Sequence, residues 1–234
     1  MDHSGGRVRS NKQTRGQGRT KDFPRLLGER LCLHFVNTVE GPASGDPVDF
    51  LSGYADLVRW SWHADAITEA ESGRLLDEAG TRPGEAAEVY GRALALRAAC
   101  DEVFRAVARS VAPGERDLGR IRTEYLAALA HARLCPADGG GFEWSRSVES
   151  DDLGRVLWPV ARSAVELLTG ADFRRLKECP GAGDCGWLFY DTSRNGTRRW
   201  CSMEGCGSRV KMRRHYVSRL REAHDTGRDQ VPGL

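Results

Sequence analysis

The sequence predicts a mainly α-helical protein with a small β element (α+β), in which a helical N-terminal domain precedes a smaller cysteine-rich module. Two observations carry this prediction. Across residues 48–168, apolar side chains recur every three or four positions, which is the period of amphipathic helices packed around a core. After residue 174, four cysteines stand in two close pairs around a run of strand-forming residues, which is typical of a small fold that needs a cross-link or a metal ion.

Residues 1–22 form a basic segment that holds six Lys or Arg against two acids. Such a composition cannot bury enough apolar surface to offset the entropy of ordering, so we expect a disordered tail, with a DNA-touching arm as the alternative. The segment lacks the apolar run of a signal peptide, and no stretch of the chain approaches the roughly twenty apolar residues of a membrane-spanning helix. We therefore expect a cytoplasmic protein without a membrane segment.

The N-terminal domain is predicted to span residues 23–173. It opens with a short apolar run at 31–39, whose periodicity fits either a helix or a strand. A loop at 41–47 follows, and the next helix is predicted at 48–62, where six apolar residues share one face.

Thr68 and Glu71 have the spacing of a capping box, which predicts the start of a helix that ends near Gly80. The clearest periodicity in the chain predicts a long helix at 84–111. Cys100 lies on the apolar face of that helix, so we expect it to belong to the core rather than to a metal site.

A further helix is predicted at 115–134, after a Pro-Gly break. The glycine-rich segment 135–141 predicts a turn, and 142–145 predicts a short strand that forms a hairpin with the residues before the turn. The last helix of the domain is predicted at 153–168, where Pro159 either kinks the helix or marks the start of a new one.

The net charge of +2 hides an uneven distribution along the chain. Residues 23–173 hold sixteen Lys or Arg against twenty-four acids, whereas residues 174–221 hold twelve against four. An acidic body with a basic cysteine-rich module indicates a polyanionic partner such as nucleic acid.

Five residues separate Cys179 from Cys185, four separate Cys201 from Cys206, and fifteen lie between the two pairs. Four thiolates on two short loops supply the soft tetrahedral ligand set that Zn²⁺ prefers, and the spacing differs from that of iron–sulfur ferredoxins. An odd total of seven cysteines fits a reducing compartment better than a disulfide framework. We predict one structural Zn²⁺ bound by these four residues; ordinary free thiols or a disulfide pair are the alternatives.

Between the two pairs, residues 187–191 are rich in strand formers and 192–197 contain Asn-Gly, a strong hairpin signal. We predict that 198–201 returns as the second strand, and that a helix follows at 208–223. Knuckle, hairpin and helix in this order indicate a treble-clef-like four-cysteine zinc finger.

The predicted C-terminal helix has two faces. An apolar stripe, expected to pack against the aromatic residues of the hairpin, consists of Met212, Tyr216, Val217 and Leu220. Rows of Arg and Lys at such spacings attract phosphates, although most charge runs are simply solvated faces. The candidate nucleic-acid contacts are Arg194, Arg198, Arg199, Arg209, Lys211, Arg213, Arg214 and Arg221.

The module resembles the CGNR-type zinc finger. The residues that carry this resemblance are Cys179-x5-Cys185, Asp191-x-Ser193, Asn195 and Arg198-x-Trp200-Cys201-Ser202-Met203-x-x-Cys206-Gly207-x-Arg209-x-Lys211. The run Leu31 to Thr38 is similar to the opening of the ABATE domain, which precedes this finger in bacterial proteins. Two residues depart from the family pattern: Ser208 replaces the Asn of the name motif, and His34 stands where the family usually has Asp.

The resemblance implies a bacterial transcription regulator, sometimes described as stress-induced, whose finger binds DNA and whose four cysteines hold zinc. The expected organisation is a basic tail at 1–22, a helical regulatory domain at 23–173, a finger at 174–225 and a tail at 226–234. The expected partner is double-stranded DNA, which would place the protein at the nucleoid. The helical domain is expected to sense an unidentified effector or to form a homodimer.

Other functions remain open at this stage. An RNA- or protein-interaction adaptor would use the same basic face, and a thiol-redox switch would release zinc when the thiolates oxidise. No nucleophile elbow, phosphate-binding glycine loop or HExxH is present in the sequence, so we expect no catalytic activity.

Overall fold

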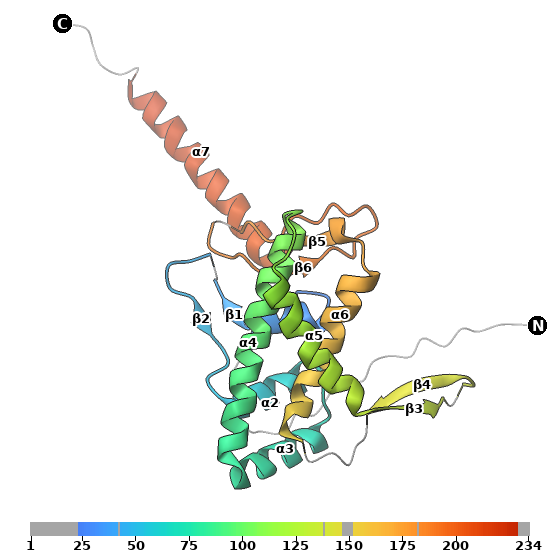
Figure 1. Cartoon of the computed structure of the whole chain (residues 1–234). Helices are drawn as coiled ribbons and strands as arrows, with labels where there is room; N and C mark the ends of the chain where they lie inside the picture. Colours follow the sequence, from blue (N-terminus) through green and yellow to red (C-terminus); the bar gives the residue numbers. More distant parts are fainter. Residues whose placement is uncertain (1–22, 42, 138, 147–151, 182, 229–234) are drawn as a thin grey trace, which may run out of the picture.

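The long helix that the sequence predicts at 84–111 is the central element of the computed structural model, where it runs as α4 (Pro83–Ala108) (Figure 1). The structure describes residues 23–41, 43–137, 139–146, 152–181 and 183–228. The predicted tail at 1–22 and the last six residues of the predicted tail at 226–234 lie outside this range.

Helices dominate the described part of the chain, and the strands form small antiparallel pairs, as the sequence predicts. The remaining helices are α1 (Leu31–Val36), α2 (Tyr54–His63), α3 (Glu69–Thr81), α5 (Glu115–Ala130), α6 (Trp158–Gly170) and α7 (Ser208–Arg228). Short turns of other helix types are η1 (Leu153–Leu157), η2 (Phe173–Arg175) and η3 (Met203–Gly207). The strand pairs are β1 (Val39–Glu40) with β2 (Val48–Asp49), β3 (Ala132–Pro136) with β4 (Phe142–Arg146), and β5 (Leu176–Glu178) with β6 (Leu188–Tyr190).

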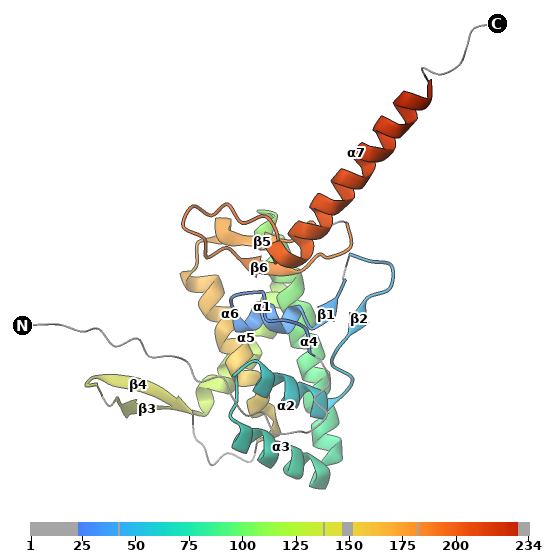
Figure 2. The same ribbon diagram turned by 180° about the vertical axis from the view of Figure 1, so that it is seen from behind.

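Helix α4 packs against α1, α2, α3, α5 and the start of the finger, and the core lies around it (Figures 1 and 2). Its predicted apolar face is buried, with Ala93, Leu96, Cys100 and Val103 fully inaccessible. Cys100 is therefore a core residue, as predicted. None of the helices in the described residues is long and apolar enough to cross a membrane.

The capping box predicted at Thr68 and Glu71 is present at the start of α3. The Thr68 hydroxyl accepts the Glu71 N–H at 3.2 Å, and the Glu71 carboxylate accepts the Thr68 N–H at 2.8 Å. These two bonds satisfy backbone donors that the first helical turn leaves unpaired. The ambiguous run at 31–39 begins as the helix α1.

The helix predicted at 48–62 is wrong in its first part, because Val48–Asp49 forms β2 and the helix begins only at Tyr54. A tertiary contact explains the difference. The Asp49 carboxylate pairs with the guanidinium of Arg97, a buried side chain from α4. That pairing fixes the strand against α4 and outweighs the helical periodicity of the segment.

The helix predicted at 115–134 ends at Ala130, and its last residues form β3 instead. The predicted hairpin with 142–145 is confirmed. Its first strand begins as early as Ala132 because that residue pairs with Arg146 at the end of β4. At Pro159, the second predicted alternative is correct: α6 is a new helix with the proline in its first turn, where a missing N–H costs nothing.

The predicted hairpin in the finger is wrong in its pairing. β6 pairs with β5, which precedes the first cysteine pair, while residues 198–201 form no strand. Side chains replace the expected ladder there. The Lys177 ammonium donates to the carbonyls of Gly196 and Arg198 at 2.6 and 3.0 Å, which holds the returning chain as a loop.

The β5–β6 hairpin has one face in each of two hydrophobic clusters. Leu176, Leu188 and Tyr190 share one face and belong to the main core around α4. Phe189 lies on the opposite face, in a second cluster with the four cysteines. The finger is therefore built onto the helical domain and shares its core.

Helix α7 leaves this body at η3 and projects away from it (Figures 1 and 2). The prediction that its apolar stripe packs against the hairpin is wrong for the residues with described side chains: Met212 is 72% exposed, Tyr216 65% and Val217 39%. Because α7 points away from the body where it leaves η3, these residues lie beyond the hairpin (Figures 1 and 2). The helix also continues five residues past the predicted end.

Candidate metal centre and nucleic-acid interface

The four cysteines of the finger meet at one point. All their Sγ atoms lie within 4.8 Å of one another, and all four side chains are buried. Cys201 Sγ lies 3.7 Å from the Sγ of both Cys185 and Cys206. A tetrahedral Zn²⁺ with Zn–S bonds of about 2.3 Å separates its sulfur ligands by about 3.8 Å. The sulfur positions therefore match one tetrahedral zinc ion.

The pKa values of Cys179, Cys185 and Cys201 also indicate that a cation binds between the four sulfurs. Hydrogen bonds from the thiols of Cys185 and Cys201 lower the pKa of Cys179 to about 2. The same bonds to Cys179 raise the pKa values of Cys185, to about 12, and of Cys201. Buried thiols this close cannot all ionise by themselves, so a divalent cation is needed before all four can be thiolates.

The first cysteine pair is positioned by the end of the β5–β6 hairpin. The Cys179 N–H donates to the Trp187 carbonyl at 2.8 Å, and the Gly186 N–H donates to the Cys179 carbonyl at 3.1 Å. Gly181 makes the sharp turn between them, with φ of +48°, and a Cβ there would lie 2.6 Å from the Cβ of Cys185. Only glycine fits this turn without displacing a ligand.

The second pair is positioned by η3, which leads directly into α7. The Ser202 hydroxyl accepts the Gly205 N–H at 3.1 Å, and the Ser202 carbonyl accepts the Gly207 N–H at 3.0 Å. Ser208, which replaces the family's Asn, donates its hydroxyl to the Met203 carbonyl at 3.0 Å. The turn that presents Cys206 therefore also sets the direction of α7.

Two arginines of the predicted interface face the metal centre. Arg209 donates to the Cys206 sulfur at 3.2 Å, and this bond, with the charge on that sulfur, raises the pKa of the guanidinium. Arg198 donates to the carbonyls of Leu27, Trp200 and Cys201, pairs with Glu29, and stacks over Phe189. Its guanidinium thus ties the loop before Cys201 to the segment before α1.

The other predicted contacts lie on the outside of the finger. Arg194 and Arg199 project from the loop, and Lys211, Arg213 and Arg214 are exposed on α7. Arg221 is also on α7, but its side chain lies outside the described set. The described side chains among them are therefore exposed basic groups on the finger loop and on the first turns of the projecting helix.

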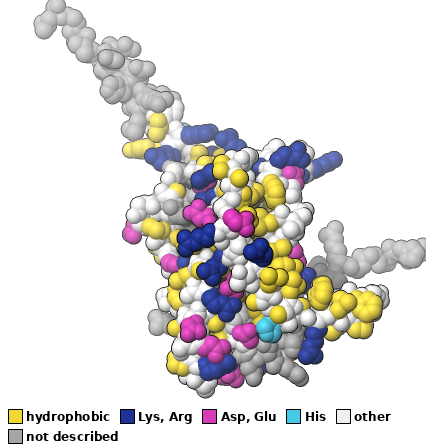
Figure 3. All heavy atoms as spheres, viewed as in Figure 1, with side chains coloured by type: hydrophobic (Ala, Val, Ile, Leu, Met, Phe, Trp, Pro, Cys, Tyr) yellow, Lys and Arg dark blue, Asp and Glu magenta, His cyan; other side chains and the backbone are white. Residues whose placement is uncertain are grey.

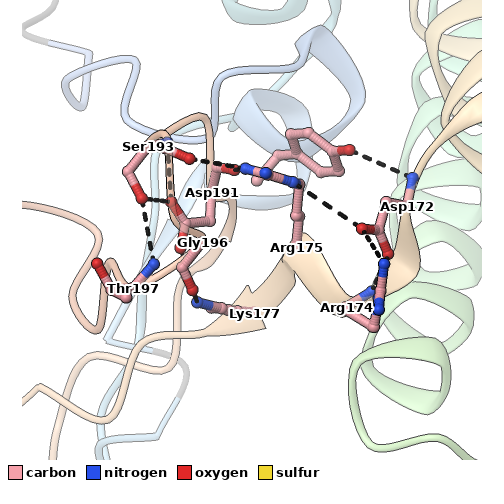
Figure 4. Close-up of polar contacts among 9 residues, drawn as sticks. Asp172, Arg174, Arg175, Lys177, Asp191, Ser193, Gly196 and Thr197 are labelled. Atoms are coloured by element: carbon pink, nitrogen blue, oxygen red, sulfur yellow. Dashed lines mark hydrogen bonds and ion pairs between the residues drawn. The ribbon is translucent and has the colours of Figure 1, made fainter.

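A buried carboxylate organises the loop that carries Arg194 and Arg199 (Figure 4). Asp191 accepts hydrogen bonds from Lys177 at 2.7 Å, from the N–H and hydroxyl of Ser193, and from the Arg198 N–H at 2.8 Å. Burial favours the neutral acid, but these donors outweigh it and hold the pKa of Asp191 well below its usual range. The ionised carboxylate therefore serves as the fixed centre of the loop.

The helical domain contacts the hairpin through residues that the sequence reasoning did not single out. Asn37, which is 3% exposed, donates to the Leu188 carbonyl at 2.8 Å and accepts the Leu188 N–H at 3.0 Å. The Trp187 indole donates to the Val39 carbonyl at 2.8 Å. The signal in the sequence was Asn37 itself, an amide side chain inside the mostly apolar run 31–39, because a buried amide must find hydrogen-bond partners.

Ion pairs add to this connection on the side of α4. Glu178 of β5 accepts from Arg105 at 2.8 Å and from Arg109 at 2.8 Å. Three separate contacts, from the C-cap residue of α1, from β1 and from α4, therefore hold the hairpin that carries the first cysteine pair.

Comparison with known families finds two matches in the chain. A family model described as "CGNR zinc finger" matches residues 175–219. The ABATE model, described as "Putative stress-induced transcription regulator", matches residues 29–171. No curated protein matches the chain. The four cysteines within ligating distance, together with the finger match, support one structural zinc ion.

Proposed function

Because the chain belongs to the ABATE family and carries a CGNR zinc finger, we propose that it is a transcription regulator that binds double-stranded DNA through the finger. In this proposal, Cys179, Cys185, Cys201 and Cys206 hold one structural Zn²⁺ and no catalysis is involved. The helical domain senses a signal or pairs with a second copy, and the protein acts in the cytoplasm at the nucleoid.

The observation that carries the proposal is the projecting basic helix α7, which starts at the metal centre. A helix is about 10–12 Å wide with its side chains, which fits the roughly 12 Å major groove of B-DNA. Lys211, Arg213 and Arg214 are exposed along it. The exposed Tyr216 and Val217 add apolar surface that can meet thymine methyl groups.

The arginines divide into two roles under this proposal. Arg198 and Arg209 fix the finger, through their contacts with the loop carbonyls and with the Cys206 sulfur. Arg194, Arg199, Lys211, Arg213, Arg214 and Arg221 contact phosphates. This division removes Arg198 and Arg209 from the phosphate contacts that the sequence suggests.

The test is binding of the zinc-loaded full chain to a 30-bp duplex, measured by fluorescence anisotropy across a salt series. Each phosphate contact contributes about −0.9 to the slope of log affinity against log salt. Replacing Lys211 and Arg214 with Ala should make the slope of log affinity against log salt less negative by about 1.8 without changing the zinc content. The matched control replaces the exposed Arg74 and Arg122, on α3 and α5, and should leave the slope unchanged.

Absence of duplex binding at low salt would refute the proposal. Tighter binding to RNA of the same length would favour the adaptor function. Release of zinc by mild peroxide, with loss of DNA binding that dithiothreitol and zinc restore, would add a redox response to the regulator.

A further inference from the structure

The β3–β4 hairpin is an arm with one apolar face. It projects from the body beside α5 and α6 (Figures 1 and 2). Leu134 lies opposite Trp144, and Pro136 lies opposite Phe142. Because directly opposed residues share a face of an antiparallel pair, these four side chains line the same side of the arm. Leu134 is 58% exposed, Phe142 72% and Trp144 54%.

The apolar face of the arm continues into a groove at its base. Tyr125 and Leu129 of α5, Trp158 of α6, and Ala132 and Trp144 of the arm line a cavity of about 270 Å³, and the ion-paired Arg162 and Glu166 of α6 also line it. Figure 3 shows the hydrophobic side chains gathered on the arm and on the neighbouring surface of the body. Leu126 and Leu129 of α5 add further exposed apolar area.

The size of the groove indicates what can occupy it. Sites for small-molecule ligands enclose roughly 300–1,000 Å³, so this groove is smaller than most of them and suits one aromatic side chain. Phe142 is such a side chain, and it is the most exposed aromatic residue on the arm. It does not line its own groove, since Trp144, nearer the base of the arm, occupies that position.

We propose that a second copy of this chain covers the arm, with Phe142 of each copy entering the groove of the other. One chain carries both a projecting apolar arm and a groove beside it, and this self-complementarity is what a twofold symmetric interface requires. An isolated two-stranded hairpin is only marginally stable in water, so the arm gains most when its apolar face is covered.

The area is sufficient for a dimer. At their exposed fractions, Phe142 and Trp144 each leave on the order of 100–150 Å² of aromatic surface to cover. With Leu126, Leu129 and Leu134, the patch is on the order of 500 Å² per copy, and two copies together bury the roughly 1,000 Å² expected of a biological interface. The patch is separate from the finger, so the pairing does not depend on DNA binding.

The test is sedimentation velocity of the zinc-loaded full chain between about 1 and 100 µM. We expect a reversible dimer whose Kd rises about thirtyfold or more in Phe142→Ala, as for an aromatic side chain at the centre of an interface. Phe173→Ala is the matched control: Phe173 is 43% exposed in η2, beside the finger, and the Kd should not change. Circular dichroism checks that both variants fold as the wild type does.

A photo-reactive phenylalanine analogue at position 142, in a mixture of isotopically light and heavy chains, then locates the contact. We expect cross-links between light and heavy chains, to residues 125–129 or 158–162. A monomer at 100 µM, an unchanged Kd in Phe142→Ala, cross-links within one chain, or growth beyond the dimer would each overturn the proposal, the last because it signals a head-to-tail contact.

Discussion

Replacement of Asn37 tests whether the helical domain and the finger are coupled through one amide. In the native chain this side chain satisfies both backbone groups of Leu188, at 2.8 and 3.0 Å, in a buried position. Asn37→Ala leaves a buried N–H and a buried C=O without partners. Each such group costs about 1–3 kcal/mol, so for the two groups we expect a loss of about 2–6 kcal/mol in the free energy of unfolding. That is a large part of the roughly 5–15 kcal/mol of a typical domain.

The assay is urea unfolding of the zinc-loaded chain, with zinc retention measured by competition with a chromophoric chelator. Leu188 lies three residues after Cys185, so the variant should also release zinc more readily. Asn195→Ala, at an exposed loop position, is the control and should change stability by less than about 0.5 kcal/mol. An equally small effect of Asn37→Ala would refute the reasoning.

Asn37→Asp separates hydrogen bonding from packing, since it keeps the size of the side chain. An ionised carboxylate can accept the Leu188 N–H but repels its carbonyl oxygen, whereas the protonated acid can donate to that oxygen. Folding should therefore raise the pKa of this introduced acid, and lowering the pH towards 5 should recover stability relative to the wild type. If the deficit stays constant with pH, the amide acts only through its volume.

Three other predictions concern the metal, the pH response and the finger loop. Chelation, or Cys201→Ser, should remove one zinc ion per chain by elemental analysis and abolish DNA binding together with the ordered turn at η3. Burial lowers the pKa of His34 to about 4 from its ordinary 6.5. Between these two pH values the unfolded chain binds a proton at this imidazole and the folded chain does not. The free energy of unfolding should therefore fall by roughly 3 kcal/mol in total as the pH drops from 6.5 towards 4. His34→Gln should remove this part of the pH dependence in urea unfolding between pH 7 and 5, and an unchanged slope would show that the imidazole titrates normally. Lys177→Met should cost about 2–4 kcal/mol in the free energy of unfolding because it takes a charged donor from the buried Asp191. Lys211→Met, at an exposed position on α7, should cost almost nothing in the same assay.

The sequence predicts those features that depend on local pattern. The long helix α4, the capping box at Thr68 and the clustering of the four cysteines each follow from periodicity or spacing within one segment. Two of the wrong predictions involve partners that are distant in the chain. Val48 and Asp49 form a strand because Arg97 of α4 holds the Asp49 carboxylate. The finger hairpin uses β5 because its two faces meet two different clusters, which no local signal in 187–201 reveals.

The apolar stripe on α7 shows the limit of the same reasoning. Met212 and Tyr216 have the spacing of a packed face, and that spacing led to the wrong expectation of contact with the hairpin. Periodicity predicts that a helix has an apolar face, but the turn at η3 sets the direction of α7 and therefore which surface that face can contact. The side chains that govern the direction of this turn, Ser202 and Ser208, are small polar residues that carry no periodic signal.

The shared core has a consequence for regulation. Because Leu176, Leu188 and Tyr190 pack in the main core while Phe189 packs with the cysteines, a displacement of α1 or α4 changes both faces of the hairpin. Any ligand that binds one arrangement of the helical domain more tightly must then alter zinc affinity by the same factor by which zinc alters the affinity for that ligand. A change in the zinc affinity of the full chain on substitution in the helical domain, as in Asn37→Ala, therefore measures the coupling between the helical domain and the finger.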